Sequence, residues 1–137
     1  MTEFIVPAGS VPNKADARGG VISVGAVNVQ TPNTIELFSS RGPTNDGRLA
    51  PGHVAPDGVL TSVPGFAPFF GTSAATPHAA GMAALLLGKV PSLTPQQVRR
   101  ALQDATLDLG QFGPDNTYGH GLIDGSVFTR IPVLRLR

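Results

Sequence analysis

Short apolar runs separated by turn-forming residues occur along much of the chain and predict buried strands. The clearest run covers residues 21–27, which are rich in β-branched side chains and are bounded by glycine and asparagine. Shorter strands are expected at residues 5–6, around residue 54 and at residues 59–61. Pro56-Asp57-Gly58 carries turn-forming residues and is expected to turn the chain between the last two strands.

Two longer stretches predict helices. Residues 73–87 contain no charged side chain and are rich in Ala and Leu, which is typical of a helix that is apolar on every side and therefore buried. Further along, Thr94 is followed by Pro95 and by Gln97, the pattern of an N-cap with a capping box. One face of this second helix is apolar and is expected to pack against the rest of the molecule; it carries Val98, Leu102 and Ala105.

Strands mixed with a buried helix predict an α/β fold, a sheet covered by helices. The tail, residues 131–137, alternates between apolar and other residues like an edge strand. No repeat or linker divides the sequence, so residues 1–137 are expected to form a single unit.

The composition excludes several classes of protein. Ten Lys and Arg against nine Asp and Glu give a net charge of +1, which disfavours nucleic acid or an anionic membrane as a partner. With 14% charged and 41% hydrophobic residues the chain is not intrinsically disordered, and without cysteine it has no disulfide, thiolate metal site or Cys nucleophile. No segment has the pattern of a signal peptide or a membrane span, so the chain is expected to be soluble.

Ser73 stands at the start of the predicted apolar helix. The first turn of a helix directs unpaired N–H groups and the positive end of the dipole toward this position, and both stabilise an oxyanion beside a serine nucleophile. Gly71 removes side-chain bulk just before it, so a substrate backbone can approach. Taken alone, a serine before an apolar helix is more often an ordinary N-cap, so these residues by themselves favour that interpretation. The nucleophile elbow of lipase-type hydrolases is excluded, because Ala75 stands where that motif requires glycine.

Residues 71–81, Gly-Thr-Ser-Ala-Ala-Thr-Pro-His-Ala-Ala-Gly, resemble the active-site serine motif of the subtilases, the subtilisin-like serine proteases. Further segments resemble the same family in the same order: residues 21–27, 38–43, 54–56 and 118–124. Together they cover almost all of residues 4–125. The resemblance implies that Ser73 is a nucleophile. It also implies part of a three-layer α/β fold, a mostly parallel sheet flanked by helices, with Ser73 at the N-terminus of a buried central helix.

The chain departs from the family pattern at the catalytic triad. Subtilases carry the triad in the order Asp, His, Ser, but this sequence contains neither an Asp-[Ser/Thr]-Gly nor a His-Gly-Thr motif. Residues 1–137 therefore resemble the C-terminal portion of a peptidase domain. The three histidines are interpreted otherwise: His78 as a packed helical residue, His53 as a surface residue and His120 as a structural residue in a turn.

A second departure concerns the oxyanion hole, to which the family contributes an asparagine from an Ala-Ala-Gly-Asn strand end. The matching residues here are 6–10, Val-Pro-Ala-Gly-Ser, so Ser10 stands where asparagine is expected. Asn13 is an alternative donor. The backbone N–H of Ser73 is the other group that the resemblance places in the oxyanion hole.

The resemblance also implies substrate-binding residues. Those that line the primary specificity pocket or flank the nucleophile are Ala8, Gly9, Gly71 and Thr72. Three aromatic side chains either contribute to the pocket or pack beneath it: Phe66, Phe69 and Phe70. Asp57 replaces the glycine of the family's Ala-Pro-Gly segment, and the sequence gives no functional account of it.

Two functions of different classes follow. The first is a serine endopeptidase acting on peptides or proteins, with Asp and His supplied by the rest of a longer polypeptide or by a complementing chain. The second is an inactive subtilase fragment that serves as a binding or assembly module, and a homo-oligomer is possible. Under either function, the isolated chain is expected to expose apolar surface that the missing half of the domain would cover.

No cofactor is required by this chemistry. Subtilases often carry calcium, but the candidate segment, residues 45–47 (Asn-Asp-Gly), forms only a turn-sized cluster with too few oxygens for the ion. The resemblance favours a secreted or cell-envelope protein, although no signal peptide is expected at residue 1.

Overall fold

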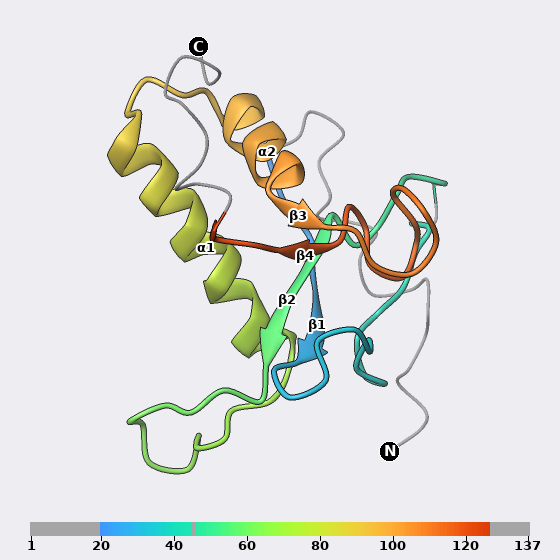
Figure 1. Ribbon diagram of the computed structural model, residues 1–137, viewed down its shortest axis with the longest axis vertical. Helices are drawn as coiled ribbons and strands as arrows, with labels where there is room; N and C mark the ends of the chain where they lie inside the picture. The colour runs from blue at the N-terminus through green and yellow to red at the C-terminus, as the bar shows by residue number, and fades with distance from the viewer. Residues whose placement is uncertain (1–19, 45, 127–137) are drawn as a thin grey trace.

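The computed structural model describes residues 20–44 and 46–126. Within these residues the elements, in chain order, are β1 (Val24–Asn28), β2 (His53–Asp57), α1 (Thr72–Lys89), α2 (Pro95–Asp104), β3 (Thr106–Leu107) and β4 (Leu122–Ile123). The described strands form one sheet in the order β1-β2-β4-β3, with β1, β2 and β4 parallel and β3 antiparallel to β4 (Figure 1). The predicted α/β fold with a mostly parallel sheet is confirmed. The strands expected at residues 5–6 and 131–137 lie outside the described residues.

Helix α1 covers one face of β1 and β2. Ala26 and Ala55, neighbours in the register of the two strands, pack against Ala75 of the helix. Because all three side chains are small, the helix lies close to the sheet, and Figure 1 shows it running beside the two strands. The opposite face of the sheet is covered by loop residues, with a core of Val27, Ile35 and Val54 against Leu109, Tyr118 and Leu122.

Helix α2 begins as the sequence predicts. Thr94 Oγ1 accepts a hydrogen bond from the Gln97 N–H at 3.3 Å, and Gln97 Oε1 accepts one from the Thr94 N–H at 2.8 Å, so the capping box is confirmed. Its buried face joins the end of α1 in a core of Leu86, Val90, Leu93, Val98, Ala101 and Leu102.

Three strand predictions were wrong, two at one end of the strand and one altogether. The first strand begins at Val24, not at residue 21. Pro56 and Asp57 do not turn the chain but complete β2, because they pair with β1. Proline is tolerated there because β4 pairs with β2 only at Val54, so the missing N–H of Pro56 faces no partner strand. The turn follows at Gly58. Residues 59–61 form no strand, since Val59 makes only an isolated bridge to Phe69.

The prediction that α1 is buried on every side was also wrong. Only Ala74, Ala75, Ala79 and Leu86 are buried, whereas Leu85 is 69% exposed. The sheet and α2 cover one side of the helix, and no other element of the described residues covers the rest. None of the described helices is long and apolar enough to span a membrane.

Candidate active site

Ser73 is the second residue of α1 and is exposed. Gly71 occupies the N-cap position, and no side-chain hydrogen bond caps the helix in the described part of the chain. The N-cap interpretation of Ser73 is therefore wrong. A serine in the first turn, open to solvent and beside N–H groups that have no acceptor within the helix, meets the geometric conditions for a nucleophile next to an oxyanion site.

Gly71 and Thr72 lie directly beside Ser73 and are both half-buried. Gly71 adopts φ +119°, a left-handed conformation that favours glycine, and its carbonyl accepts the Ala74 N–H at 2.9 Å and the Ala75 N–H at 3.2 Å. The Thr72 carbonyl accepts the Thr76 hydroxyl at 2.8 Å. The two predicted substrate-binding residues that the structure describes thus adjoin the nucleophile on a hydrogen-bonded helix start.

Asp57 ends β2 and is completely buried. Its Oδ2 accepts a hydrogen bond from the Gly71 N–H at 2.8 Å, while Oδ1 is buried without a partner in the described part of the chain. Burial raises the pKa of Asp57 above its ordinary value; the Gly71 N–H opposes this shift, and the nearby Glu36 carboxylate adds to it. Sequence reasoning missed this contact. The signal was an acidic residue replacing glycine at the end of a buried strand.

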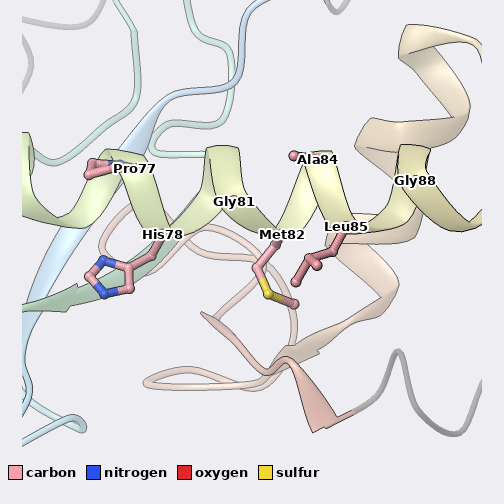
Figure 2. A pocket seen from close by; sticks show the side chains of 7 residues that line it. All are labelled: Pro77, His78, Gly81, Met82, Ala84, Leu85 and Gly88. Atoms are coloured by element: carbon pink, nitrogen blue, oxygen red, sulfur yellow. The ribbon is translucent and has the colours of Figure 1, made fainter.

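His78 lies on α1, and its Nδ1 is 2.9 Å from the Ala74 carbonyl oxygen. Contrary to the prediction, it is not packed inside but exposed. Five positions after Ser73, it is rotated by about 140° around the helix from the serine. Figure 2 shows its ring on the same side of α1 as Met82 and Leu85. These side chains line a shallow apolar surface, here called the α1 groove: Pro77, His78, Gly81, Met82, Ala84, Leu85 and Gly88.

The surface position predicted for His53 was wrong. It begins β2, pairs in register with Val24 and is 1% exposed, with neither ring nitrogen hydrogen-bonded to a described residue. Burial is the main cause that lowers its pKa to about 4, and the charges of His120 and Arg99 contribute to the same shift. Register in the sheet, which the local sequence does not reveal, places this side chain inside. His120 contributes a main-chain hydrogen bond to the fold: its N–H donates to the Gly52 carbonyl at 2.9 Å.

Four of the predicted site residues lie outside the described residues: Ala8, Gly9, Ser10 and Asn13. Their roles in the pocket and the oxyanion hole stay predictions. In the candidate calcium segment, Asp46 forms an ion pair with Arg48 at 2.8 Å. A hydrogen bond from Arg48 and a smaller contribution from the Thr44 hydroxyl lower the Asp46 pKa to about 2. The described residues contain no cluster of three or more metal-ligating side chains.

Comparison with known proteins decides the family. A family model of the subtilases matches residues 5–121. The chain belongs to the subtilase family. It is 42% identical over 105 residues to a subtilisin of Bacillus pumilus, a match that covers 75% of this chain and 34% of the relative. It is 36% identical over 115 residues to the minor extracellular protease Epr of Bacillus subtilis, covering 84% of this chain and 17% of that protein.

The fold agrees with this assignment. The CspB protease of Clostridium perfringens has a similar structure, with a TM-score of 0.67 and 30% identity over 81% of this chain and 26% of that chain. The subtilase thus spans about a third or less of the length of these relatives. The predicted resemblance, the subtilisin-like α/β fold and the serine protease family are confirmed.

Proposed function

We propose that this subtilase chain supplies the nucleophile of a serine endopeptidase and that the triad Asp and His come from outside its 137 residues. The observation that carries the proposal is the position of Ser73, exposed in the first turn of α1 within the family's serine motif. Family membership supports the reaction class.

In the proposed reaction, Ser73 Oγ attacks the carbonyl carbon of a peptide bond while the triad histidine takes the hydroxyl proton. The negative charge that develops on the carbonyl oxygen is stabilised by the Ser73 N–H and the positive end of α1. The histidine then gives its proton to the departing amine, leaving an acyl-enzyme. Water hydrolyses this ester and restores the serine. Ser10, or Asn13 in its place, is proposed as the second oxyanion donor.

The substrate is proposed to be an extended peptide lying against Gly71 and Thr72, with Ala8 and Gly9 forming one wall of the pocket for the side chain before the scissile bond. The absence of side-chain bulk at Gly71 allows this approach. No cofactor takes part in these steps.

Two of the described histidines, His53 and His78, support an external base. His53 is buried, and His78 lies on another side of the helix from Ser73. We place the rest of the catalytic domain, with the triad Asp and His, against the exposed side of α1. The α1 groove is apolar, and the chain matches only part of its relatives' length, as expected if further domain residues cover it.

A second function, an inactive binding or assembly module, is favoured by two features of the sequence. The chain lacks the motifs for Asp and His and has Ser10 where the family has asparagine. In this alternative the α1 groove binds a partner chain or a second copy.

The secreted location that we propose for the protease rests on family membership and on a relative named as extracellular.

The two functions are separated by hydrolysis of a chromogenic peptide. The complete protease, containing all three triad residues, should be active, and Ser73→Ala should abolish turnover while Ser62→Ala, a change at another exposed serine, should not. The 137-residue chain alone should show no turnover, because loss of the triad histidine in subtilisin lowers kcat by about 10⁶. Turnover by the chain alone that depends on Ser73 would contradict an external base, and an inactive complete protein would favour the module.

A further inference from the structure

Asp57 and Gly71 join two parts of the chain that are 14 residues apart. The first ends β2 in the interior of the molecule, and the second is the N-cap residue of α1. Their hydrogen bond, 2.8 Å from the Gly71 nitrogen to Asp57 Oδ2, closes the loop of residues 58–70 at its base. The same loop is held further out by the Val59–Phe69 bridge, in which the Phe69 N–H donates to the Val59 carbonyl at 2.8 Å.

This contact acts on the backbone that carries Ser73. The Gly71 carbonyl already accepts two N–H groups of the first helical turn, so Gly71 is fixed to α1 on one side and to the sheet, through Asp57, on the other. A Cβ at Gly71 would have room, because its nearest neighbour would be 3.6 Å away. The special requirement at this position is therefore the backbone conformation, with φ at +119°, and not the space around the residue. Without the carboxylate, the start of α1 has one fewer tie to the sheet.

Resting on the proposed function, we propose that Asp57 is a positioning residue for Ser73: its carboxyl group holds the Gly71 N–H and thereby fixes the first turn of α1 at the end of β2. Nothing in this role requires Asp57 to touch the substrate. The residue replaces a glycine of the family pattern, so this chain makes a contact that a glycine side chain does not offer.

The contact with Gly71 needs only an acceptor oxygen on the Asp57 side chain. Burial and the nearby Glu36 raise the Asp57 pKa, while the Gly71 N–H lowers it. A charged and a neutral carboxyl group both offer an oxygen to the Gly71 N–H. Asparagine has the same shape and the same acceptor, which makes Asp57→Asn the informative conservative variant.

The kinetic test compares Asp57→Ala with Asp57→Asn in the complete protease. Removal of the acceptor should lower kcat about 10- to 100-fold with little change in KM, because a small misplacement of the reacting group is costly, whereas asparagine should restore kcat to within about threefold of the original. Asp46→Asn, a change at an exposed carboxylate paired with Arg48, should leave kcat unchanged. An unchanged kcat in Asp57→Ala, or an equal loss in both Asp57 variants, would overturn the proposal.

Hydrogen exchange at Gly71 provides a readout that does not depend on activity. The measurement compares the original complete protease with its two Asp57 variants. The Gly71 amide should exchange faster in Asp57→Ala than in the original and should regain its protection in Asp57→Asn. Equal exchange in the original and Asp57→Ala would overturn the contact itself. An original protein with normal Gly71 protection but no peptide turnover would instead overturn the proposed function, and with it the reaction that Asp57 serves.

Discussion

Ser39 Oγ accepts a hydrogen bond from the backbone N–H of Ala26, at 3.0 Å, in the interior of the protein. The bond ties the Phe-Ser-Ser-Arg-Gly-Pro segment to strand β1, 13 residues away. Little space is left around it, because a Cβ added at Gly25 would lie 3.0 Å from both Ser39 Oγ and Val54 Cγ1. This part of the family's sequence pattern therefore reflects packing against the sheet.

Replacing Ser39 by alanine should destabilise the protein by about 1–3 kcal/mol, because the Ala26 N–H would be left buried without an acceptor. Urea denaturation measures the change in the free energy of unfolding. Ser62→Ala is the matched control, since Ser62 is exposed and should change stability little. Equal stability of the two variants would show that the Ser39 hydroxyl does not satisfy this N–H.

His53 should make stability fall in acid. Its pKa is lowered from 6.5 to about 4 in the folded protein, so the unfolded chain takes up a proton across a pH range in which the folded protein does not. This contribution is complete above the unfolded pKa and is lost as the pH falls toward 4, by about 3 kcal/mol in total. Denaturation of His53→Gln should show a smaller loss of stability between pH 7 and pH 4.

The control for His53 is Ser62→Ala, a change at an exposed residue without a titratable side chain, which should keep the pH dependence of the original protein. If His53→Gln and the original lose the same free energy of unfolding between these pH values, the folded His53 is not held neutral by burial.

These residues show how far the sequence predicts the fold. The start of α2 depends on contacts among residues 94–97 and was correctly predicted, because capping chemistry is local. The end of β2 was missed, because Pro56-Asp57-Gly58 has a strong local turn preference that pairing with β1 overrides. The burial of His53 likewise depends on its register with Val24, which no neighbouring residue in the sequence specifies.

The candidate site divides in the same way. The motif around Ser73 could be found from the sequence because it is continuous. The contact of Asp57 with Gly71 could not, since it depends on where a loop brings two separate residues. Exposed apolar surface was expected, but its location on one side of α1 was not, because an apolar composition indicates that a helix is suited to burial but not which elements cover it.

The exposed side of α1 should make the 137-residue chain bind a hydrophobic dye when it is separated from the rest of the domain. Leu85→Lys places a charge in the α1 groove and should lower both dye binding and self-association, measured by fluorescence and light scattering. Leu60→Lys is the control, because Leu60 is 85% exposed but is not part of the groove. Equal effects of the two variants would contradict a role for the groove.

Restoring the family residue at position 10 tests the oxyanion prediction. In the complete protease, Ser10→Asn should raise kcat by up to about 10²-fold if the serine is a poor donor, since loss of the corresponding asparagine in subtilisin costs at least that much. Asn13→Ala is the companion variant. No gain from Ser10→Asn together with a loss from Asn13→Ala would assign the donor role to Asn13.

The most direct test of Ser73 as the nucleophile is labelling of the complete protease with a phosphonylating serine reagent, followed by mass-spectrometric location of the label. We expect the label on Ser73 and not on Ser39, Ser40 or Ser62. Its rate should fall as the pH drops below the pKa of the triad histidine, about 6.5 if that residue is unperturbed, because a protonated imidazole cannot accept the serine proton. Labelling of another serine, or a rate that does not change with pH, would contradict the assignment.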